Sequence, residues 1–473
     1  MSEVDTPRIS NYGDLLRTGR FRVAVWGVGY IGYSSLIHFA EEGVAGIAYD
    51  PDEARVAQVL GGEYPVPGLE DWLRIDPKPL VEKGLLSATS DPQAVLGEEQ
   101  LVDLVCVPTE REGRPWSFPL SDVMTRLAKS IAQQQDRHVR PRLVIVESTL
   151  EPGTVDRQVL PILAEHGVEA GRDVLLGVAP RRDWFVDPSR TLRTLDRIYS
   201  GHGPGGAEAV ESVLGILCDR LHRASSYRVA ELVKCVENAY RHAAISLANQ
   251  LTLGFPEVDM DEVLDLASTK WNMQRYSPSF GAGGYCIPLA GQYLLQGASR
   301  PDSLGILRAA FDGDLQIRQE VAESVIRRGR RSVGILGLAY RGDLKVSVMS
   351  PSLHIAEVLR TRGVPVKVSD PYYSAREVRD LTGLETFDPA ATLDEFDTLI
   401  VNTDHRRYLE RDVLETVQSI SRDFLILDNY GIWKDLTWPS GTRYYRAGAP
   451  GWLASLDDRP EILAAVNAGS GRP

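Results

Sequence analysis

Residues Phe21–Asp50 read FRVAVWGVGYIGYSSLIHFAEEGVAGIAYD. The apolar run Phe21–Trp26 predicts a buried strand, Ile31–Glu42 a helix, and Val44–Tyr49 a second strand that ends at an acid. The glycine pattern GVGYIG lies between the first strand and the helix. A strand, a glycine turn, a helix, a strand and an acid, in this order, are typical of a dinucleotide site.

The residue types in this turn favour NAD. Gly27 allows a tight turn, Gly29 lets backbone N–H groups approach a pyrophosphate, and Gly32 lets the helix pack close to the sheet. Asp50 would accept hydrogen bonds from the adenosine ribose and would repel the 2′-phosphate of NADP. The alternative is a doubly wound sheet that binds no phosphate.

More strands are predicted at Leu101–Val107, Leu143–Glu147 and Val174–Val178, with helices near 120–134 and 154–165. This alternation predicts a parallel doubly wound sheet, in which ligands bind beyond the carboxyl ends of the strands. Polar residues that follow two of these strands could face cofactor or substrate, although capping of the next helix is an alternative role. The predicted cofactor contacts are Gly27, Gly29, Tyr30, Ile31, Gly32, Asp50, Thr109, Ser148 and Thr149.

A long helix is predicted at about 230–251. Lys234 and Asn238 are four residues apart and therefore share a face, with Arg241 next along it. They could line a cleft in which the lysine stabilises an alkoxide and the asparagine fixes its orientation. The alternative is a surface stripe in which Lys234 pairs with Glu231.

The stretch Ser279–Ala290, SFGAGGYCIPLA, contains Cys286 after a run of small residues and before Pro288. Proline favours the first turn of a helix, so we expect Cys286 at or just before a helix N-terminus, where a thiolate is stabilised. The glycines allow close approach of a ligand, which suggests a nucleophile site. Taken alone, the cysteine fits a small buried residue beside a tight turn better than it fits a nucleophile.

The second half of the chain repeats the first module. A helix at 303–328 precedes a strand at 332–336, Gly337, a helix at 350–361, a strand at 364–369 and the pair Asp370-Pro371, and later strands are predicted at 398–402 and 424–427. We therefore expect an α/β chain with two Rossmann-like doubly wound domains joined by a central helical region. The predicted segments are a polar lead-in (1–20), an NAD-binding domain (21–205), a central helical domain with the cysteine loop (206–330), a C-terminal Rossmann-like domain (331–446) and a loosely held tail (447–473).

Length and composition narrow the classes of protein to which this chain could belong. A length of 473 residues suggests two or three domains, and a net charge of −13 argues against nucleic acid as the main partner. Four scattered cysteines and histidines without ligand spacing indicate neither a metal site nor disulfides. With no signal-peptide pattern and no membrane-spanning run, we expect a cytoplasmic protein with no membrane partner.

The order of motifs resembles the UDP-glucose/GDP-mannose dehydrogenase family from about Arg22 to Arg446. The matching stretches are GVGYIG with Asp50, VPTE at 107–110, ESTLEPGT at 147–154, KCVENAYR at 234–241, SPSFGAGGYCIP at 277–288, GLAYRG at 337–342, SP at 350–351 and DP at 370–371. These enzymes use NAD to oxidise the C6 alcohol of a nucleotide sugar to a carboxylate. The resemblance implies a nucleotide-sugar substrate, a homodimer and a place in polysaccharide or glycoconjugate biosynthesis.

The resemblance also implies residue roles. Cys286 matches the nucleophile, Lys234 and Asn238 match the pair that holds the C6 oxygen, and Thr149 matches a residue that orients the catalytic water. The thiolate would capture an aldehyde as a thiohemiacetal, and a second oxidation would give a thioester that water releases as the acid. The implied substrate contacts are Arg181, Arg241, Tyr276, Phe280, Gly283, Gly284 and Arg341.

Several positions depart from the family pattern. Arg181 stands where a glutamate usually acts on the hydrolytic water, and arginine cannot serve as a base. Leu289 and Ala290 replace a polar pair after the cysteine, and Val348 replaces an arginine at the nucleotide end, whereas Arg341 keeps its charge. Asp183 is the nearest candidate for a replacement base, and Glu151 is a weaker one.

Three hypotheses remain open. The first is a nucleotide-sugar dehydrogenase with an atypical substrate or a relocated base. The second is a two-electron dehydrogenase of the β-hydroxyacid type, which uses Lys234 and Asn238 without covalent catalysis. The third is a degenerate, non-catalytic family member, against which the survival of the cysteine, lysine and asparagine argues.

Overall fold

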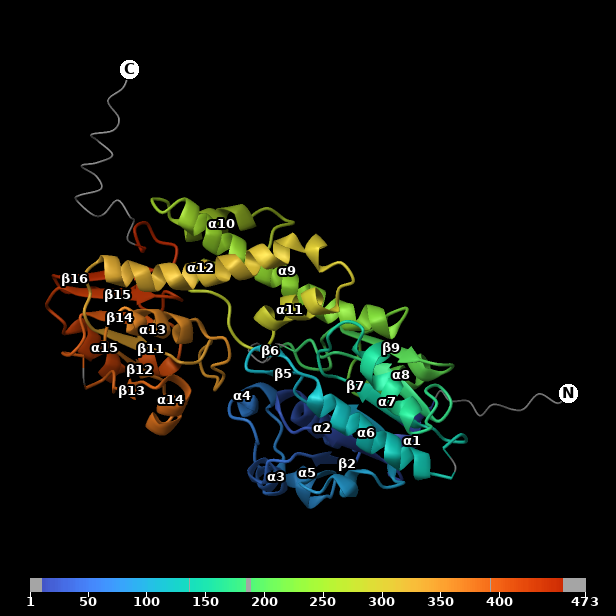
Figure 1. Cartoon of the computed structure of the whole chain (residues 1–473). Coiled ribbons are helices and arrows are strands. Elements are labelled where there is room, and N and C mark those ends of the chain that lie inside the picture. Colours follow the sequence, from blue (N-terminus) through green and yellow to red (C-terminus); the bar gives the residue numbers. More distant parts are fainter. Residues whose placement is uncertain (1–10, 136, 184–188, 392, 454–473) are drawn as a thin grey trace. The chain divides into compact units, whose positions relative to one another are not determined.

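A computed structural model describes residues 11–135, 137–183, 189–391 and 393–453 (Figure 1). The chain divides into two compact units. The first unit extends to Glu237 and includes Gln292–Pro301, and the second consists of Asn238–Gly291 and the chain from Asp302 onward. Each unit contains its own large sheet of mainly parallel strands.

The sheet of the first unit has the strand order β10-β9-β8-β7-β4-β1-β2-β3. Its strands are β1 (Arg22–Trp26), β2 (Gly46–Tyr49), β3 (Leu86–Thr89), β4 (Gln100–Val105), β7 (Arg142–Val146), β8 (Val174–Val178), β9 (Arg197–His202) and β10 (Leu221–Arg223). From β3 to β8 this is the doubly wound order, and only β8 and β9 pair antiparallel. The predicted strands are confirmed, apart from small shifts at their ends, and β3, β9 and β10 are additional. The strands β5 (Glu110–Arg111) and β6 (Arg114–Pro115) form a separate hairpin.

Helices cover both faces of this sheet. They are α1 (Tyr12–Arg17), α2 (Tyr30–Glu41), α3 (Glu53–Leu60), α4 (Leu69–Leu73), α5 (Lys78–Glu82), α6 (Phe118–Gln133), α7 (Leu160–Glu165), which continues a π-helical turn at Val155–Val159, and α8 (Gly206–Leu214). Val23 and Val25 of β1 pack in the core layer that contains α2, whereas Ala24 and Trp26 face the layer that contains α6. Both faces of β1 are therefore buried, which explains its unbroken apolar sequence.

The expected polar lead-in is wrong for its described part. Residues 12–17 form α1, in which Leu16 is completely buried and Tyr12 nearly so. The Gly13 N–H donates to the Ser212 hydroxyl of α8 at 3.2 Å. Tertiary packing against α8 overrides a sequence that looks polar on average. Residues 1–10 lie outside the described part of the chain.

The second unit repeats the doubly wound order with every pair parallel, β13-β12-β11-β14-β15-β16. Its strands are β11 (Val333–Leu336), β12 (Val366–Ser369), β13 (Glu385–Thr386), β14 (Thr398–Val401), β15 (Phe424–Asp428) and β16 (Thr442–Arg446). Its helices are α10 (Met260–Ser268), α12 (Gly305–Arg327), α13 (Pro351–Thr361), α14 (Ala375–Thr382) and α15 (Arg411–Gln418). The expectation of two Rossmann-like sheets is confirmed.

Two helices run from one unit into the other. They are α9 (Tyr227–Gly254) and α11 (Ile287–Gly297), and the division between the units falls inside both. The predicted borders at 205, 330 and 446 stay a prediction.

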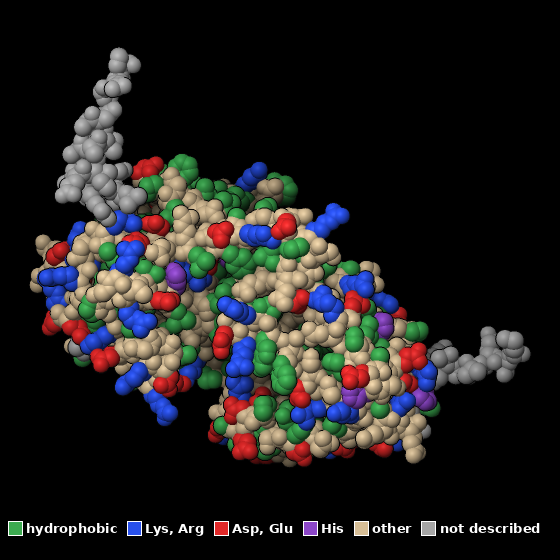
Figure 2. All heavy atoms as spheres, in the orientation of Figure 1, with side chains coloured by type: hydrophobic (Ala, Val, Ile, Leu, Met, Phe, Trp, Pro, Cys, Tyr) green, Lys and Arg blue, Asp and Glu red, His purple; other side chains and the backbone are tan. Residues whose placement is uncertain are grey.

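The described part of the expected loose tail is packed. Trp452 is nearly completely buried, and its ring stacks on Phe280 with centroids 5.8 Å apart and planes 6° from parallel. Residues 454–473 lie outside the described part of the chain. On the face drawn in Figure 2, acidic and basic side chains are interspersed over the surface. None of the described helices is long and apolar enough to cross a membrane.

Candidate functional site

The glycine turn between β1 and α2 has the geometry that its sequence predicts. Gly27 has φ +101°, and a Cβ there would lie 2.6 Å from the Cys106 carbonyl oxygen. A Cβ on Gly32 would lie 1.9 Å from the Gly27 oxygen, so only glycine lets α2 pack this closely. Gly29 differs, because a Cβ there would meet nothing within 4 Å. The space in front of Gly29 is therefore open to a ligand.

Polar groups around this turn fit a dinucleotide. Gly29 is the N-cap of α2 and has no side chain that could cap the helix, so the N-terminus of α2 lies beside the open space at Gly29. Asp50 follows β2, and its Oδ2 accepts the Val28 N–H at 2.7 Å, which aims the carboxylate at the turn. A pyrophosphate on the helix N-terminus and a ribose on Asp50 match these donors and acceptors.

The polar residues after β4 and β7 are tied together. The Ser148 hydroxyl donates to the Val107 carbonyl at 2.7 Å, and the Thr109 hydroxyl donates to the Thr149 carbonyl at 2.7 Å. Neither hydroxyl caps a helix. The Thr149 hydroxyl makes no hydrogen bond to any residue that the structure describes, so it is available to a ligand or a water.

A cavity of about 70 Å³ lies in the first unit, lined in part by Thr109, Trp116, Glu151 and Tyr293. Burial raises the pKa of Glu151, although its ion pair with Arg157 works in the opposite direction. Glu151 is therefore a carboxylate with raised basicity in a small polar cavity.

The structure corrects the expectation that Arg181 binds substrate. Its side chain is only 2% exposed, and each of its five N–H donors has an acceptor. The acceptors are both oxygens of Asp183 at 2.6 and 2.7 Å, the hydroxyls of Ser34 and Ser35, and the Ile31 carbonyl. The guanidinium has no donor left for a substrate and acts instead as an internal counter-ion.

The same cluster argues against Asp183 as the general base. Burial by itself would raise the pKa of Asp183, but the Arg181 guanidinium outweighs it and holds that pKa below the ordinary value. Glu147 completes the cluster through ion pairs with Arg181 at 3.5 Å and with Arg197, and its pKa is lowered by the two arginines against the effect of burial. A carboxylate that is buried, paired and weakly basic is poorly suited to take a proton from water.

Helix α9 carries the predicted lysine and asparagine on a buried face. Lys234 is 9% exposed and Asn238 is 4% exposed. Neither side chain makes a hydrogen bond or ion pair with a residue that the structure describes. Glu231 does not pair with Lys234, because its carboxylate accepts the N–H groups of Gly153 and Val155 at 2.8 and 2.9 Å. The alternative of a surface stripe is therefore wrong, and two mostly buried side chains whose polar ends bind no described residue could line a ligand site.

In the second unit, Cys286 directly precedes α11, which begins at Ile287, as its sequence predicts. Its side chain is exposed, whereas Cys218 and Cys235 are buried. The next residues, Pro288, Leu289 and Ala290, are buried. A helix N-terminus behind an exposed thiol is a setting that stabilises a thiolate.

Buried side chains hold the loop that leads to Cys286. The Asn249 and Asn429 side-chain oxygens accept the N–H groups of Ser279 and Phe280 at 2.7 and 2.8 Å, Asp314 accepts the Ala282 N–H at 2.6 Å, and Arg318 donates to the Ala282 carbonyl. Asp314 and Arg318 also pair with each other. The loop that leads to Cys286 is thus held in place by the protein's own side chains, which is what a positioned reacting group would require.

The packing around this loop bears on two predicted substrate contacts, Phe280 and Tyr276. Phe280 is completely buried and belongs to the core of the second unit, so its ring cannot reach a substrate, which corrects the prediction. Tyr276 is partly buried, and its hydroxyl donates to Gln274 at 3.1 Å, which leaves its role a prediction.

Tyr340 packs against the glycines of the loop. A Cβ on Gly283 would lie 2.5 Å from the Tyr340 Cβ, and a Cβ on Gly284 would lie 2.7 Å from the ring. Burial raises the pKa of Tyr340 to about 12; Cys286 also raises it, while Arg341 and Arg241 lower it. The nucleophile therefore shares its surroundings with two arginines. Arg241 makes no hydrogen bond or ion pair with any described residue, so it can receive an anion.

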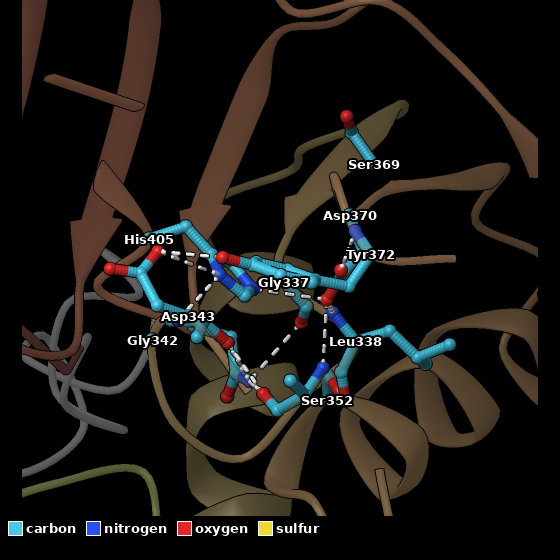
Figure 3. Close-up of polar contacts among 12 residues, drawn as sticks. Gly337, Leu338, Gly342, Asp343, Ser352, Ser369, Asp370, Tyr372 and His405 are labelled. Carbon is cyan, nitrogen blue, oxygen red and sulfur yellow. Dashed lines mark hydrogen bonds and ion pairs between the residues drawn. The ribbon is translucent and has the colours of Figure 1, made fainter. Parts of the chain in front are cut away.

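The glycine turn of the second sheet is filled by the protein's own side chains (Figure 3). Asp370 accepts the N–H groups of Leu338 and Ala339 at 2.8 and 2.9 Å, and His405 Nε2 lies 3.1 Å from the same oxygen. The Asp343 N–H donates to His405 Nδ1 at 2.9 Å, so Nε2 carries the proton that it shares with Asp370. An internal carboxylate thus satisfies the N–H groups of this turn.

The sequence analysis missed two polar groups in the second unit. His242 lies four residues after Asn238 on α9 and is 1% exposed, and Asp314 on α12 is 4% exposed. The spacing of Lys234, Asn238 and His242 was visible in the sequence. The contact of Asp314 with the cysteine loop was not, because it joins distant residues. The described residues contain no group of three or more His, Cys, Asp or Glu side chains that could hold a metal.

Comparison with known proteins agrees with this arrangement. Models of the UDP-glucose/GDP-mannose dehydrogenase family match residues 21–201 as its NAD binding domain, 228–310 as its central domain and 334–435 as its UDP binding domain. A UDP-N-acetyl-D-mannosamine dehydrogenase of Pyrococcus horikoshii is 28% identical over 433 residues, which cover 88% of this chain and 96% of that protein. A UDP-N-acetyl-D-glucosamine 6-dehydrogenase of Pseudomonas aeruginosa is 26% identical over 377 residues, covering 77% and 86%.

A solved structure, UDP-D-ManNAc dehydrogenase from Pyrococcus horikoshii, matches with a TM-score of 0.77 and 26% identity, covering 90% of this chain and 99% of that one. The open turn at Gly29 lies in the segment matched as the NAD binding domain, and the filled turn at Asp370 lies in the segment matched as the UDP binding domain. With all three domains present in sequence, the chain belongs to the UDP-glucose/GDP-mannose dehydrogenase family and is an NAD-dependent oxidoreductase that acts on the CH–OH group of a nucleotide sugar.

Proposed function

We propose that this enzyme oxidises the C6 alcohol of a UDP-N-acetylhexosamine to the uronate through a covalent intermediate on Cys286. The observation that carries the proposal is the exposed Cys286 at the start of α11, at the end of a loop held by buried side chains. The names of the relatives that span most of the chain favour an N-acetylated sugar over a plain hexose.

The chemistry follows from the residue types. Lys234 and Asn238 hold the C6 oxygen while the alcohol loses a hydride and a proton to become an aldehyde. The Cys286 sulfur adds to the aldehyde carbon, and the thiohemiacetal loses a second hydride and proton to become a thioester. Water then adds to the carbonyl carbon, the C–S bond breaks, and the carboxylate leaves. NAD accepts one hydride in each oxidation, so two are reduced for every sugar.

Unpartnered polar groups support these roles. Lys234 and Asn238 are buried, the Thr149 hydroxyl is free, and none of the three has a described partner. Such groups lower stability unless a ligand or water satisfies them. In a C6 oxidation, the lysine and asparagine would bind the oxygen that becomes negative, and the threonine would bind the hydrolytic water.

The stoichiometry of NADH tests the proposal. UDP-N-acetylglucosamine, UDP-N-acetylmannosamine and UDP-glucose are each supplied in limiting amounts with excess NAD. We expect two NADH for each molecule of an N-acetylated sugar, and a loss of turnover of roughly 10³-fold or more in Cys286→Ser. One NADH for each sugar, with full activity in Cys286→Ser, would show instead a two-electron dehydrogenase that needs no covalent step, which is the alternative favoured by the loss of a base at Arg181.

Substitutions at Arg241 and at Arg181 distinguish a proposed substrate contact from an internal counter-ion. We propose that Arg241 and Arg341, with the backbone of Gly283 and Gly284, bind the nucleotide end of the substrate. Arg241→Met should raise KM by roughly 10- to 100-fold with little loss of stability, since a charge-assisted hydrogen bond contributes about 1.5–3 kcal/mol. Arg181→Met should instead lower the free energy of unfolding by about 3–5 kcal/mol, because it leaves Asp183 buried without its counter-ion, while Glu147 keeps only Arg197. The reverse pattern would refute both assignments.

We also propose that the enzyme is a homodimer. Helix α9 exposes a row of large apolar side chains at spacings of three, four and seven residues, Val229, Leu232, Val236, Tyr240 and Leu247, with Tyr240 77% exposed. A second copy of the chain would bury this row. Sedimentation should give twice the chain mass, and Tyr240→Glu with Leu247→Glu should give a monomer. A wild-type monomer would reject the proposal.

A further inference from the structure

The proposed chemistry needs a base to activate water, and the usual positions do not supply one. Leu289 and Ala290 after the nucleophile are apolar and buried, and Asp183 is held in an ion pair with its pKa lowered. Arg181 cannot accept a proton. A proton acceptor for the thioester step must therefore come from another part of the chain.

His242 is the buried polar residue that continues the face of Lys234 and Asn238. It lies one helical turn beyond Asn238 on α9, and the spacing of four residues places its side chain on the same side of the helix. It is 1% exposed, and its Nε2 has no hydrogen-bond partner in the described part of the chain. Buried polar atoms in folded proteins are almost always satisfied, so an unsatisfied imidazole nitrogen on a catalytic face calls for a ligand or a water.

The ring of His242 packs against the helix that begins beside the nucleophile. Its Nδ1 would lie 3.9 Å from a Cβ on Gly291, which is five residues after Cys286 on α11. On the other side, the His242 and Phe311 rings meet edge to face with centroids 4.9 Å apart. A Cβ on Gly291 would lie 2.9 Å from the Phe311 ring, so glycine at this position allows α11 to fit against both rings.

The surroundings keep the imidazole neutral. Burial lowers the pKa of His242; Asp314 of α12 opposes this effect and Arg318 adds to it. These two are the charged groups of the described chain that act on it, and they pair with each other. A neutral imidazole at pH 7 can accept a proton, unlike the paired carboxylates of the first unit.

We propose that His242 accepts the proton of the water that hydrolyses the Cys286 thioester. This role rests on the proposed covalent function. The water oxygen forms a bond to the thioester carbonyl carbon while one of its protons moves to the imidazole. The C–S bond then breaks with its electron pair left on sulfur, the carboxylate departs, and the proton passes from the imidazole to solvent. The step consumes one water and involves no change of oxidation state.

The test separates oxidation from hydrolysis. His242→Gln keeps side-chain volume and hydrogen bonding but cannot act as a base. After mixing with UDP-N-acetylglucosamine or UDP-N-acetylmannosamine and NAD, this variant should form two NADH for each active site in a rapid burst. Its turnover should then be roughly 10²- to 10⁴-fold slower than wild type, the usual contribution of a general base. Mass spectrometry should find the acyl group on Cys286, and hydroxylamine should restore turnover, because it cleaves the thioester without the help of a base.

His354→Gln provides the matched control. His354 also has a lowered pKa and lies near Arg318 and Asp314, but it is on α13, away from the face of Asn238. We expect this variant to show no acyl accumulation and wild-type turnover. The proposal is overturned if His242→Gln turns over normally, if it loses the burst together with turnover, or if the acyl group accumulates in Glu151→Gln instead. If the wild type forms one NADH for each sugar and no adduct, the proposed covalent function is wrong, and the proposed role of His242 is then wrong as well.

Discussion

The glycine turns of the two sheets share the backbone conformation of their first glycine but differ in where the next helix starts. Gly27 and Gly337 have φ angles of +101° and +100°, and each turn faces an aspartate that follows the second strand of its sheet. In the first unit α2 begins at Tyr30, three residues after Gly27, and Asp50 accepts only the Val28 N–H from the turn. In the second unit α13 begins only at Pro351, and Asp370 binds two N–H groups of the turn and His405.

This difference decides which turn can hold a dinucleotide. Where the helix starts directly after the glycines, its unsatisfied N–H groups and its dipole are available to a pyrophosphate. Where a long loop separates them, the N–H groups of the turn need an acceptor from the protein itself, and Asp370 provides it. With the same strand order and the same Asp-Pro pair, one turn is therefore left open at Gly29, whereas the other is satisfied by the protein's own side chains.

Replacement of the two aspartates, Asp50 and Asp370, should give the largest difference between the two turns. Asp370→Ala leaves two buried N–H groups and His405 without an acceptor, so the free energy of unfolding of the second unit should fall by about 3–5 kcal/mol. Asp50→Ala should cost the first unit only about 1–3 kcal/mol but should weaken NAD binding by roughly 10- to 100-fold. Hydrogen exchange resolved by unit and NAD titration measure the two effects. Equal losses of stability would contradict the distinction.

Substitutions at two glycines of the first turn should separate the packing of α2 from the binding of NAD. Gly32→Ala places a Cβ 1.9 Å from the Gly27 oxygen, so α2 must move, at a cost of about 2–4 kcal/mol. Gly29→Ala meets no protein atom within 4 Å and has φ −83°, so stability should change by less than about 1 kcal/mol. NAD affinity should nevertheless fall by about tenfold or more, because the new Cβ occupies the approach of the pyrophosphate. Thermal unfolding with and without NAD distinguishes the two, and unchanged affinity in Gly29→Ala would place the cofactor elsewhere.

A fall in pH should lower the stability of α2 and α13, the helices that follow the two turns, by a smaller amount. Burial lowers the pKa of His38 on α2 and of His354 on α13. Below an ordinary histidine pKa of about 6.5, the unfolded chain binds a proton that the folded chain resists, so stability is lost as the pH falls and is unaffected above that value. Because both side chains are partly exposed, we expect less than about 1 kcal/mol for each between pH 7 and pH 5.

Hydrogen exchange at the two pH values measures this loss helix by helix. His38→Gln should remove the acid sensitivity of α2 and leave that of α13, and His354→Gln should do the reverse. If either variant changed both helices equally, the effect would belong to the whole molecule and not to the individual histidines.

Much of the fold could be predicted because it depends on neighbours along the chain. The strands of both sheets, the helix at Lys234 and the helix that starts after Cys286 follow from local apolar patterns and from glycine and proline positions. The strands β9 (RIYSGH) and β10 (LHR) were missed because polar residues interrupt their apolar pattern, and β10 has only three residues. Helix α1 was missed because its stability comes from contact with α8 rather than from its own sequence.

The sequence by itself determined the two doubly wound modules, the glycine turn of the NAD binding domain and the place of Cys286 just before a helix, since each is a pattern within a few tens of residues. Only the tertiary structure decided what the polar side chains do. The sequence suggested Arg181 as a substrate contact, but its N–H groups donate to Asp183 and to Ser34, which is 147 residues away in the chain. Phe280 proved to be core, and His242 proved to be buried, with an Nε2 that has no hydrogen-bond partner in the described part of the chain. Burial and hydrogen-bond partners depend on contacts between distant residues, and these fix the charge and basicity of a group far more than its place in a motif.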